Sequence, residues 1–83
     1  MRGRNAKEAV AQRIQILCAQ HDMTINALAN QSGIPSSTIY SMINTKSLNP
    51  GVVSIQKICD GLGISVREFF DDPLFENLEQ EIK

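Results

Sequence analysis

Few residues in this chain of 83 amino acids have the types and spacing that metal binding requires. Cys18 and His21 are three residues apart and could share one helix face, but no CxxC or HxxxH motif completes a zinc site. Cys59 is far from Cys18 in the sequence, and two isolated cysteines are typical of reduced thiols buried as small hydrophobes. We therefore predict no metal ion.

The sequence also lacks the elements of an enzyme active site. It has one histidine, no paired carboxylates at a spacing that would line a pocket, no glycine-rich phosphate loop and no cofactor motif. His21 lies near an expected helix end, where an imidazole complements the helix dipole. We predict that the protein is not an enzyme and binds no cofactor.

The side chains best suited to chemistry are hydrogen-bonding groups between positions 36 and 44. If this segment is a helix, Ile39, Met42 and Ile43 form an apolar stripe at i, i+3 and i+4. The polar residues on the remaining surface are Ser36, Ser37, Tyr40, Ser41 and Asn44. Small hydrogen-bonding side chains of this kind can approach base edges in the major groove of DNA.

The elements that must position this face are short helices. Apolar residues recur at helical spacing and no alternation is long enough for a strand, so we predict an all-α fold. The expected helices cover residues 5–21, 25–31, 36–44 and 52–61, with a fifth helix starting at the capping box of residues 65–68. Leu74, Phe75, Leu78 and Ile82 predict a further short amphipathic tail helix.

The turn between the second and third helices is the most informative one. Thr24 is a good N-cap for the second helix, and Gly33 follows that helix, where a left-handed backbone is cheap only for glycine. Pro35 then lies at or just before the start of the third helix. Two short helices joined by a tight turn, the second with an exposed polar face, form a helix-turn-helix pattern.

Charge is distributed unevenly along the chain. The formal net charge is −1, yet residues 1–13 sum to +3 and residues 68–83 sum to −5. The sum for the basic head includes Arg13. If the head and the acidic tail fold to different sides, we expect the protein to have a mildly positive face. Arg2, Arg4 and Lys7 could form a minor-groove arm or a solvated tail. No apolar run or signal segment is evident, so we predict a cytoplasmic protein that does not enter a membrane.

With these residues in view, positions 13–70 resemble the Cro/CI family of phage and bacterial repressors, also called the XRE family. The matching segments are 13–17, 23–29, 32–34, 37–39, 49–50 and 58–70. The last segment is the most specific, because its Leu-Gly-apolar-Ser turn leads to two phenylalanines. The resemblance implies a five-helix lambda-repressor-like fold that binds double-stranded operator DNA as a homodimer.

The resemblance also implies which residues face DNA. The start of the second helix would anchor to phosphate, the third helix would face bases and nearby phosphates, and the loop after it would follow the backbone. The predicted DNA-binding residues are Thr24, Asn26, Ser36, Ser37, Thr38, Tyr40, Ser41, Asn44 and Lys46.

Three features depart from the family pattern. Ile25 stands where a glutamine commonly clamps a phosphate, and the third helix lacks the usual Arg or Gln reader. Cys18 and Ile43 stand where the family often buries an Arg–Glu pair. Replacing a buried ion pair by apolar groups is often neutral or stabilising, so the fold is expected to persist.

These observations predict two parts and one function. Residues 1–72 are expected to form the helix-turn-helix domain with its basic arm, and residues 73–83 an acidic amphipathic tail that contacts a dimer partner, covers the domain or frays. The predicted function is a sequence-specific transcriptional regulator, with repression as the expected direction, reading a palindromic operator through the third helix. The alternative is a protein-interaction module on the same fold, such as an antitoxin-like or anti-repressor component. No small-molecule ligand domain is evident.

Overall fold

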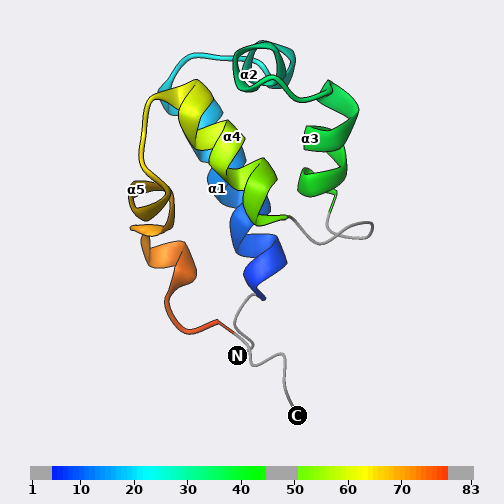
Figure 1. Cartoon of the computed structure of the whole chain (residues 1–83). Helices are drawn as coiled ribbons and strands as arrows, with labels where there is room; N and C mark the ends of the chain where they lie inside the picture. The colour runs from blue at the N-terminus through cyan, green and yellow to red at the C-terminus, as the bar shows by residue number, and fades with distance from the viewer. Residues whose placement is uncertain (1–4, 45–50, 79–83) are drawn as a thin grey trace.

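The computed structural model describes residues 5–44 and 51–78, and these residues form helices without any strand. The helices are α1 (Ala6–Gln20), α2 (Ile25–Ser32), α3 (Ser36–Ile43), α4 (Val52–Leu62), α5 (Val66–Phe70) and the 3-10 helix η1 (Pro73–Phe75). In Figure 1, α1 runs through the middle, α2 crosses the top, and α3 and α5 lie on opposite sides. The predicted all-α fold with five α-helices is confirmed, with boundaries shifted by a residue or so.

Local hydrogen bonds explain where the helices begin. Asn5 and Glu8 form a capping box at α1: the Glu8 N–H donates to Asn5 Oδ1 at 2.8 Å, and the Asn5 N–H donates to Glu8 Oε1 at 3.1 Å. At α5, Ser65 Oγ accepts from the Glu68 N–H at 2.9 Å. Each cap satisfies N–H groups that have no partner inside the helix, which fixes the first turn.

The apolar stripes of the helices meet in one core. The core residues of α1 are the stripe predicted from its periodicity, Val10, Ile14, Leu17 and Cys18. The others are Leu28, Ala29, Ile39, Met42, Ile55, Ile58, Cys59, Leu62 and Phe69. Phe69 is the largest of the fully buried side chains, so its ring anchors α5 in the core.

The helices α2 and α4 approach closely where small residues face each other. A Cβ added to Gly61 would lie 2.5 Å from Ser32 Oγ and 3.0 Å from the Ser32 backbone nitrogen. Ser32 Oγ is buried without a hydrogen-bond partner. This crossing requires a glycine on α4, and it holds α2 firmly against the core.

The tail differs from its prediction. Of the described tail residues 73–78, only Pro73–Phe75 are helical, as the 3-10 turn η1, and Asn77 has a left-handed φ of 58°. Residues 76–78, including Leu78 of the predicted tail helix, are described and are not helical, and Ile82 lies outside the described residues. Phe75 instead packs on Phe69 and Phe70, with ring centroids 6.2 and 4.8 Å apart. The segment up to Phe75 therefore folds back on its own domain, where η1 contacts α1.

Candidate nucleic-acid interface

The turn between α2 and α3 has the geometry that its sequence predicts. Gly33 adopts a left-handed φ of 70°, and its N–H donates to the Ala29 carbonyl to close α2. Ile34 is half-buried and packs against the core, and Pro35 is the N-cap of α3. The turn thus fixes how α3 leaves α2.

The inner face of α3 is anchored, so its outer face is available. Ile39 and Met42 are buried in the core. Ser37 is exposed, and Tyr40 keeps 52% of its surface accessible. This alternation places a polar, mostly hydroxyl-bearing surface on a helix that cannot rotate without exposing its core contacts.

The other predicted interface residues occupy several environments. Asn26 on α2 and Asn44, the C-cap of α3, are exposed. The half-buried ones are Ser36, Thr38 and Ser41. Lys46 lies in 45–50, outside the described residues. Five predicted residues thus lie on α3, namely Ser36, Ser37, Thr38, Tyr40 and Ser41. Asn26 lies in the first turn of α2.

The start of α2 presents backbone donors beside α3. Thr24 is the N-cap, and its hydroxyl accepts from the Ala27 N–H at 3.1 Å. Ile25 and Asn26 lie in the first turn of α2, where backbone N–H groups have no carbonyl partner inside the helix. These N–H groups lie at the positive end of the helix dipole. Backbone groups can therefore contribute anion contacts where Ile25 cannot.

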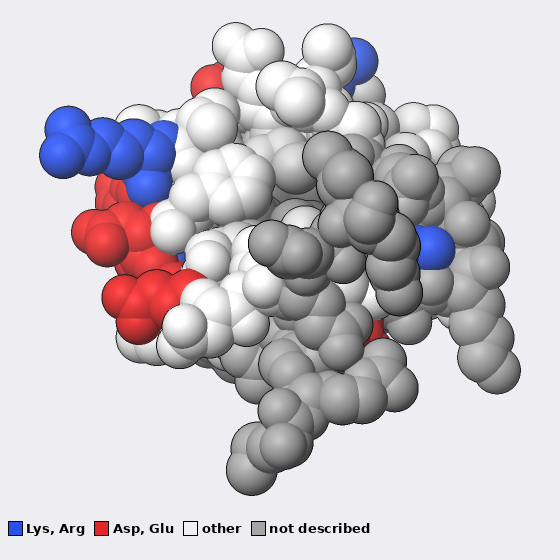
Figure 2. Space-filling model, turned by 90° about the horizontal axis from the view of Figure 1, so that it is seen from below, with Lys and Arg blue, Asp and Glu red and all other residues white. Residues whose placement is uncertain are grey.

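The helix pair itself carries no formal charge. Residues 23–45 contain no Asp, Glu, Lys or Arg. The acidic side chains gather elsewhere: Figure 2 shows them on the flank where Figure 1 places α5 and η1, across the molecule from α3. The acidic residues of that region are Glu68, Asp71, Asp72 and Glu76. The neutral helix pair and the acidic flank are thus separated.

Arg13 is not part of a basic surface, contrary to the expectation from the charge distribution. It is buried, with Nε donating to the Phe69 carbonyl at 2.7 Å and Nη2 to the Glu68 carbonyl at 3.0 Å. Its Nη1 donates to Asp72 Oδ2 at 3.1 Å. The guanidinium therefore caps α5 and anchors the start of η1.

The spacing of Arg13 from the apolar residues of α1 is a sequence signal for this burial. Position 13 is three residues after Val10 and four before Leu17, so it borders the apolar stripe of α1. An arginine there can be buried only if fixed acceptors meet it. The acceptors come from 55 to 59 residues further along the chain, which periodicity in α1 cannot reveal.

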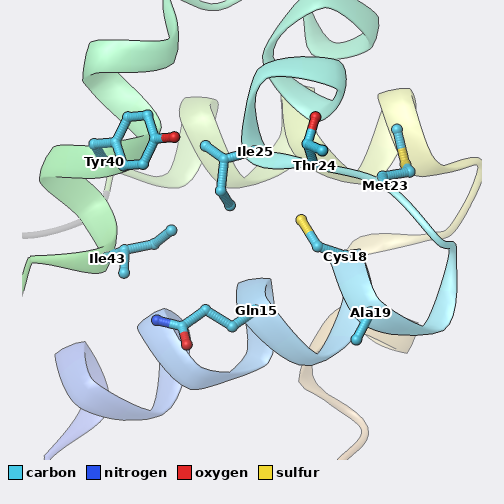
Figure 3. A pocket seen from close by; sticks show the side chains of 8 residues that line it. All are labelled: Gln15, Cys18, Ala19, Met23, Thr24, Ile25, Tyr40 and Ile43. Atoms are coloured by element: carbon cyan, nitrogen blue, oxygen red, sulfur yellow. The ribbon is translucent and has the colours of Figure 1, made fainter.

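An apolar groove of about 490 Å³ opens between α1, the start of α2 and α3. Its lining residues are Gln15, Cys18, Ala19, Met23, Thr24, Ile25, Tyr40 and Ile43 (Figure 3). Cys18 and Ile43, which the resemblance pairs, line the same groove. Burial raises the pKa of the Cys18 thiol, so this wall stays neutral near pH 7.

The described residues hold no group of three or more potential metal ligands. Within the same ranges, no helix combines the length and the hydropathy needed to cross a membrane.

These features define a helix-turn-helix DNA-binding domain. The sequence profile of the Cro/C1-type HTH DNA-binding domain matches residues 13–73, and the chain belongs to this family. The family is a non-enzymatic one, in agreement with the prediction.

One solved structure is similar to this chain over most of its length. The chain is similar to the crystal structure of the prophage Lp1 protein 11, with 35% sequence identity and a TM-score of 0.79. The match covers 90% of this chain and 99% of that one. A search of curated proteins found no match.

Proposed function

We propose that the protein is a sequence-specific transcriptional repressor that binds a palindromic operator as a homodimer. The observation that carries the proposal is the anchored α3 with its exposed polar face, in a domain of the Cro/C1-type family. In this arrangement α3 enters the major groove and α2 lies against the phosphate backbone. Two half-sites would lie about one helical turn, roughly 10 bp, apart.

The side chains of α3 would read DNA by close fit rather than by long charged readers. Ser37 and Tyr40 are the exposed members, and Ser36 and Ser41 flank them. Hydroxyl groups of this length give shorter and more water-mediated contacts than Arg or Gln. Thr24, Asn26, Asn44 and Lys46 complete the proposed contacts at the backbone.

The proposal includes a weak dependence of affinity on salt. Arg13 is withdrawn into the fold, and residues 23–45 carry no cation. About two to four phosphates neutralised per subunit would give a correspondingly shallow log–log slope. A slope near −10 in a gel-shift salt series would contradict this part of the proposal.

Two exposed valines support self-association. Val52 and Val53, at the start of α4, are 77% and 64% exposed, and adjacent large exposed hydrophobics commonly mark interaction surfaces. Analytical ultracentrifugation of the wild type and of Val52→Ser/Val53→Ser tests this: the variant should shift toward monomer while its helix content stays unchanged.

The decisive experiment begins with selection of bound sequences from a random DNA pool. On the selected site, Ser37→Glu should lower affinity about tenfold or more, because a carboxylate on α3 repels phosphate. Tyr40→Ala should weaken binding as well. Gln56 is an exposed residue of α4, outside the helix pair. Gln56→Glu adds the same charge there and serves as the matched control. An absence of any selected sequence, or equal losses in Ser37→Glu and Gln56→Glu, would overturn the proposal.

The second candidate is a protein-interaction module on the same fold. The neutral helix pair and the net charge of −1 favour it, since DNA binders usually carry a basic face. Failure of heparin and bulk DNA columns to retain the protein at low salt, together with one stoichiometric protein partner, would select this alternative.

A further inference from the structure

The groove beside the helix pair has the size and composition of a ligand site. Its volume of about 490 Å³ falls within the roughly 300–1,000 Å³ of small-molecule pockets. It borders the surface assigned to DNA, because Thr24, Ile25 and Tyr40 line it and also belong to the start of α2 and to α3. Any molecule seated in it would therefore meet the helix-turn-helix pair directly.

The lining chemistry selects the class of ligand. Ile25 and Ile43 project into the space between the helices, and the Cys18 sulfur points into it from α1 (Figure 3). Sulfur makes favourable contacts with aromatic ring edges, and Met23 adds a second sulfur atom to the lining. Among the described residues no ionised side chain lines the groove, so a charged ligand would lose hydration there without compensation from them.

Polar groups are few and sit among the apolar walls. They are the Gln15 amide and the Tyr40 hydroxyl, since the Thr24 hydroxyl accepts from the Ala27 N–H and points away from the groove in Figure 3. A small number of polar groups in an apolar pocket fixes the orientation of a ligand that carries one complementary hydroxyl or amide.

We propose that this groove binds a small neutral aromatic molecule of one or two rings, bearing one hydroxyl or amide, and that the bound molecule competes with DNA. The site is formed inside the helix-turn-helix domain itself. Competition with DNA depends on the proposed function, whereas ligand binding does not. The two are therefore measured separately.

The chain contains its own optical reporter for the groove. Tyr40 is the only tyrosine and there is no tryptophan, so fluorescence excited at tyrosine wavelengths reports on one wall of the site. Benzyl alcohol and phenylacetamide are the probes. Each should change Tyr40 emission saturably, with half-saturation in roughly the millimolar range for ligands of this size. Cyclohexylmethanol should bind several-fold more weakly than benzyl alcohol, and anionic phenylacetate several-fold more weakly than phenylacetamide. Equal responses within either pair would overturn the assigned chemistry.

The two cysteines supply an independent measurement. Cys18 lines the groove, whereas Cys59 is buried on α4 and is not part of it. At a probe concentration about ten times half-saturation, alkylation of Cys18 should slow about tenfold, and any slowing at Cys59 measures how far the probe stabilises the folded state as a whole. Alkylation of Cys18 that the probe does not slow would contradict a site at the groove.

A large side chain placed in the groove should abolish the fluorescence response of Tyr40 to the probes. Ala19 lines the groove at an exposed position, so Ala19→Phe places a ring there without disturbing the core. Gln20→Phe adds the same ring at an exposed neighbouring position outside the lining. Loss of saturable binding in Ala19→Phe with retention in Gln20→Phe supports the site, and retention in both overturns it.

The effect on DNA is measured last, on the selected operator. Phenylacetamide should weaken binding of the wild type but not of Ala19→Phe. Ligand binding without any effect on DNA binding would overturn competition and leave the site intact. Absence of DNA binding would instead contradict the proposed function, while the fluorescence and alkylation results would still decide the site.

Discussion

The two halves of α1 meet the rest of the molecule in opposite ways. Around Arg13 the contact is polar and closed, because three donor atoms meet two carbonyls and one carboxylate from α5 and the start of η1. Around Cys18 the wall is apolar and faces an open groove. We call the contact of Arg13 with α5 and the start of η1 the sealed end, and the apolar wall around Cys18 the open end. Arg13 and Cys18 are little more than one helical turn apart on α1.

The difference follows from what each residue requires of its surroundings. A buried guanidinium is costly unless its donors are satisfied, so Arg13 forces distant carbonyls and Asp72 into fixed places. A buried thiol makes no such demand. Cys18 and Ile43 can therefore leave space between α1 and α3 without leaving a polar group unpaired.

Truncation at the sealed end should give the largest effect. Phe69→Ala removes a fully buried ring that packs against Phe75, and we expect a loss of about 3–5 kcal/mol in the free energy of unfolding. Phe70→Ala, at a residue that is 39% exposed, is the matched control and should cost about 1 kcal/mol. Urea denaturation followed by circular dichroism measures both. Similar costs for the two would show that the sealed end does not rest on Phe69.

Removal of the buried cation comes next. Arg13→Leu leaves the Phe69 and Glu68 carbonyls and the Asp72 carboxylate without their donor, and should cost about 2–3 kcal/mol. Asp72→Asn keeps an oxygen that can accept from the Leu74 N–H and removes only the ion pair. Because the Asp72 side chain is partly exposed to solvent, that change should cost about 1 kcal/mol or less. If Asp72→Asn cost as much as Arg13→Leu, the ion pair rather than the carbonyl caps would hold this end.

The core stripe of α1 and the helix pair were largely predictable because their signals are local. Helical spacing identified the core stripe of α1, and Gly33 with Pro35 identified the turn before α3. The exposed face of α3 followed from the stripe of Ile39 and Met42 on its other side. That these polar residues contact DNA stays a prediction.

The sealed end was predicted poorly because its contacts join distant parts of the chain. The charge distribution counts Arg13 with the basic head, since nothing near it in sequence shows the acceptors of α5. The tail was predicted as one amphipathic helix, but Asp72 caps a 3-10 turn and Phe75 turns back onto Phe70. Aromatic packing and a side-chain cap outweighed the periodicity of a few apolar residues.

The groove could not be predicted from periodicity either. It depends on residues of modest size on separate helices, and the resemblance alone paired Cys18 with Ile43. Whether two apolar residues close a gap or leave one is decided by the distance between helix axes, which their spacing in sequence does not encode.

Truncating the thiols compares the open wall with the closed core directly. Cys59→Ala removes a side chain that is 1% exposed and should cost about 1–2 kcal/mol. Cys18→Ala removes the same group beside the groove, where little new cavity forms, and should cost about 1 kcal/mol or less. Urea denaturation under reducing conditions measures the difference, and a larger cost at Cys18 would show that the groove closes in solution.

The smallest effect should appear as a dependence on alkaline pH. Burial raises the pKa of both thiols, and the Asp60 carboxylate adds to the effect at Cys59. Thiols of the unfolded chain lose their protons near their ordinary pKa of about 8.5, whereas the folded chain keeps them longer. The stabilising contribution of each thiol is therefore complete below that pH and declines as the pH rises through it. The cost of Cys18→Ala should accordingly shrink between about pH 7.5 and pH 10, with other titrating groups cancelling in the comparison with wild type. A cost that stayed constant over this range would mean that the groove hydrates the Cys18 thiol as fully as the unfolded chain does.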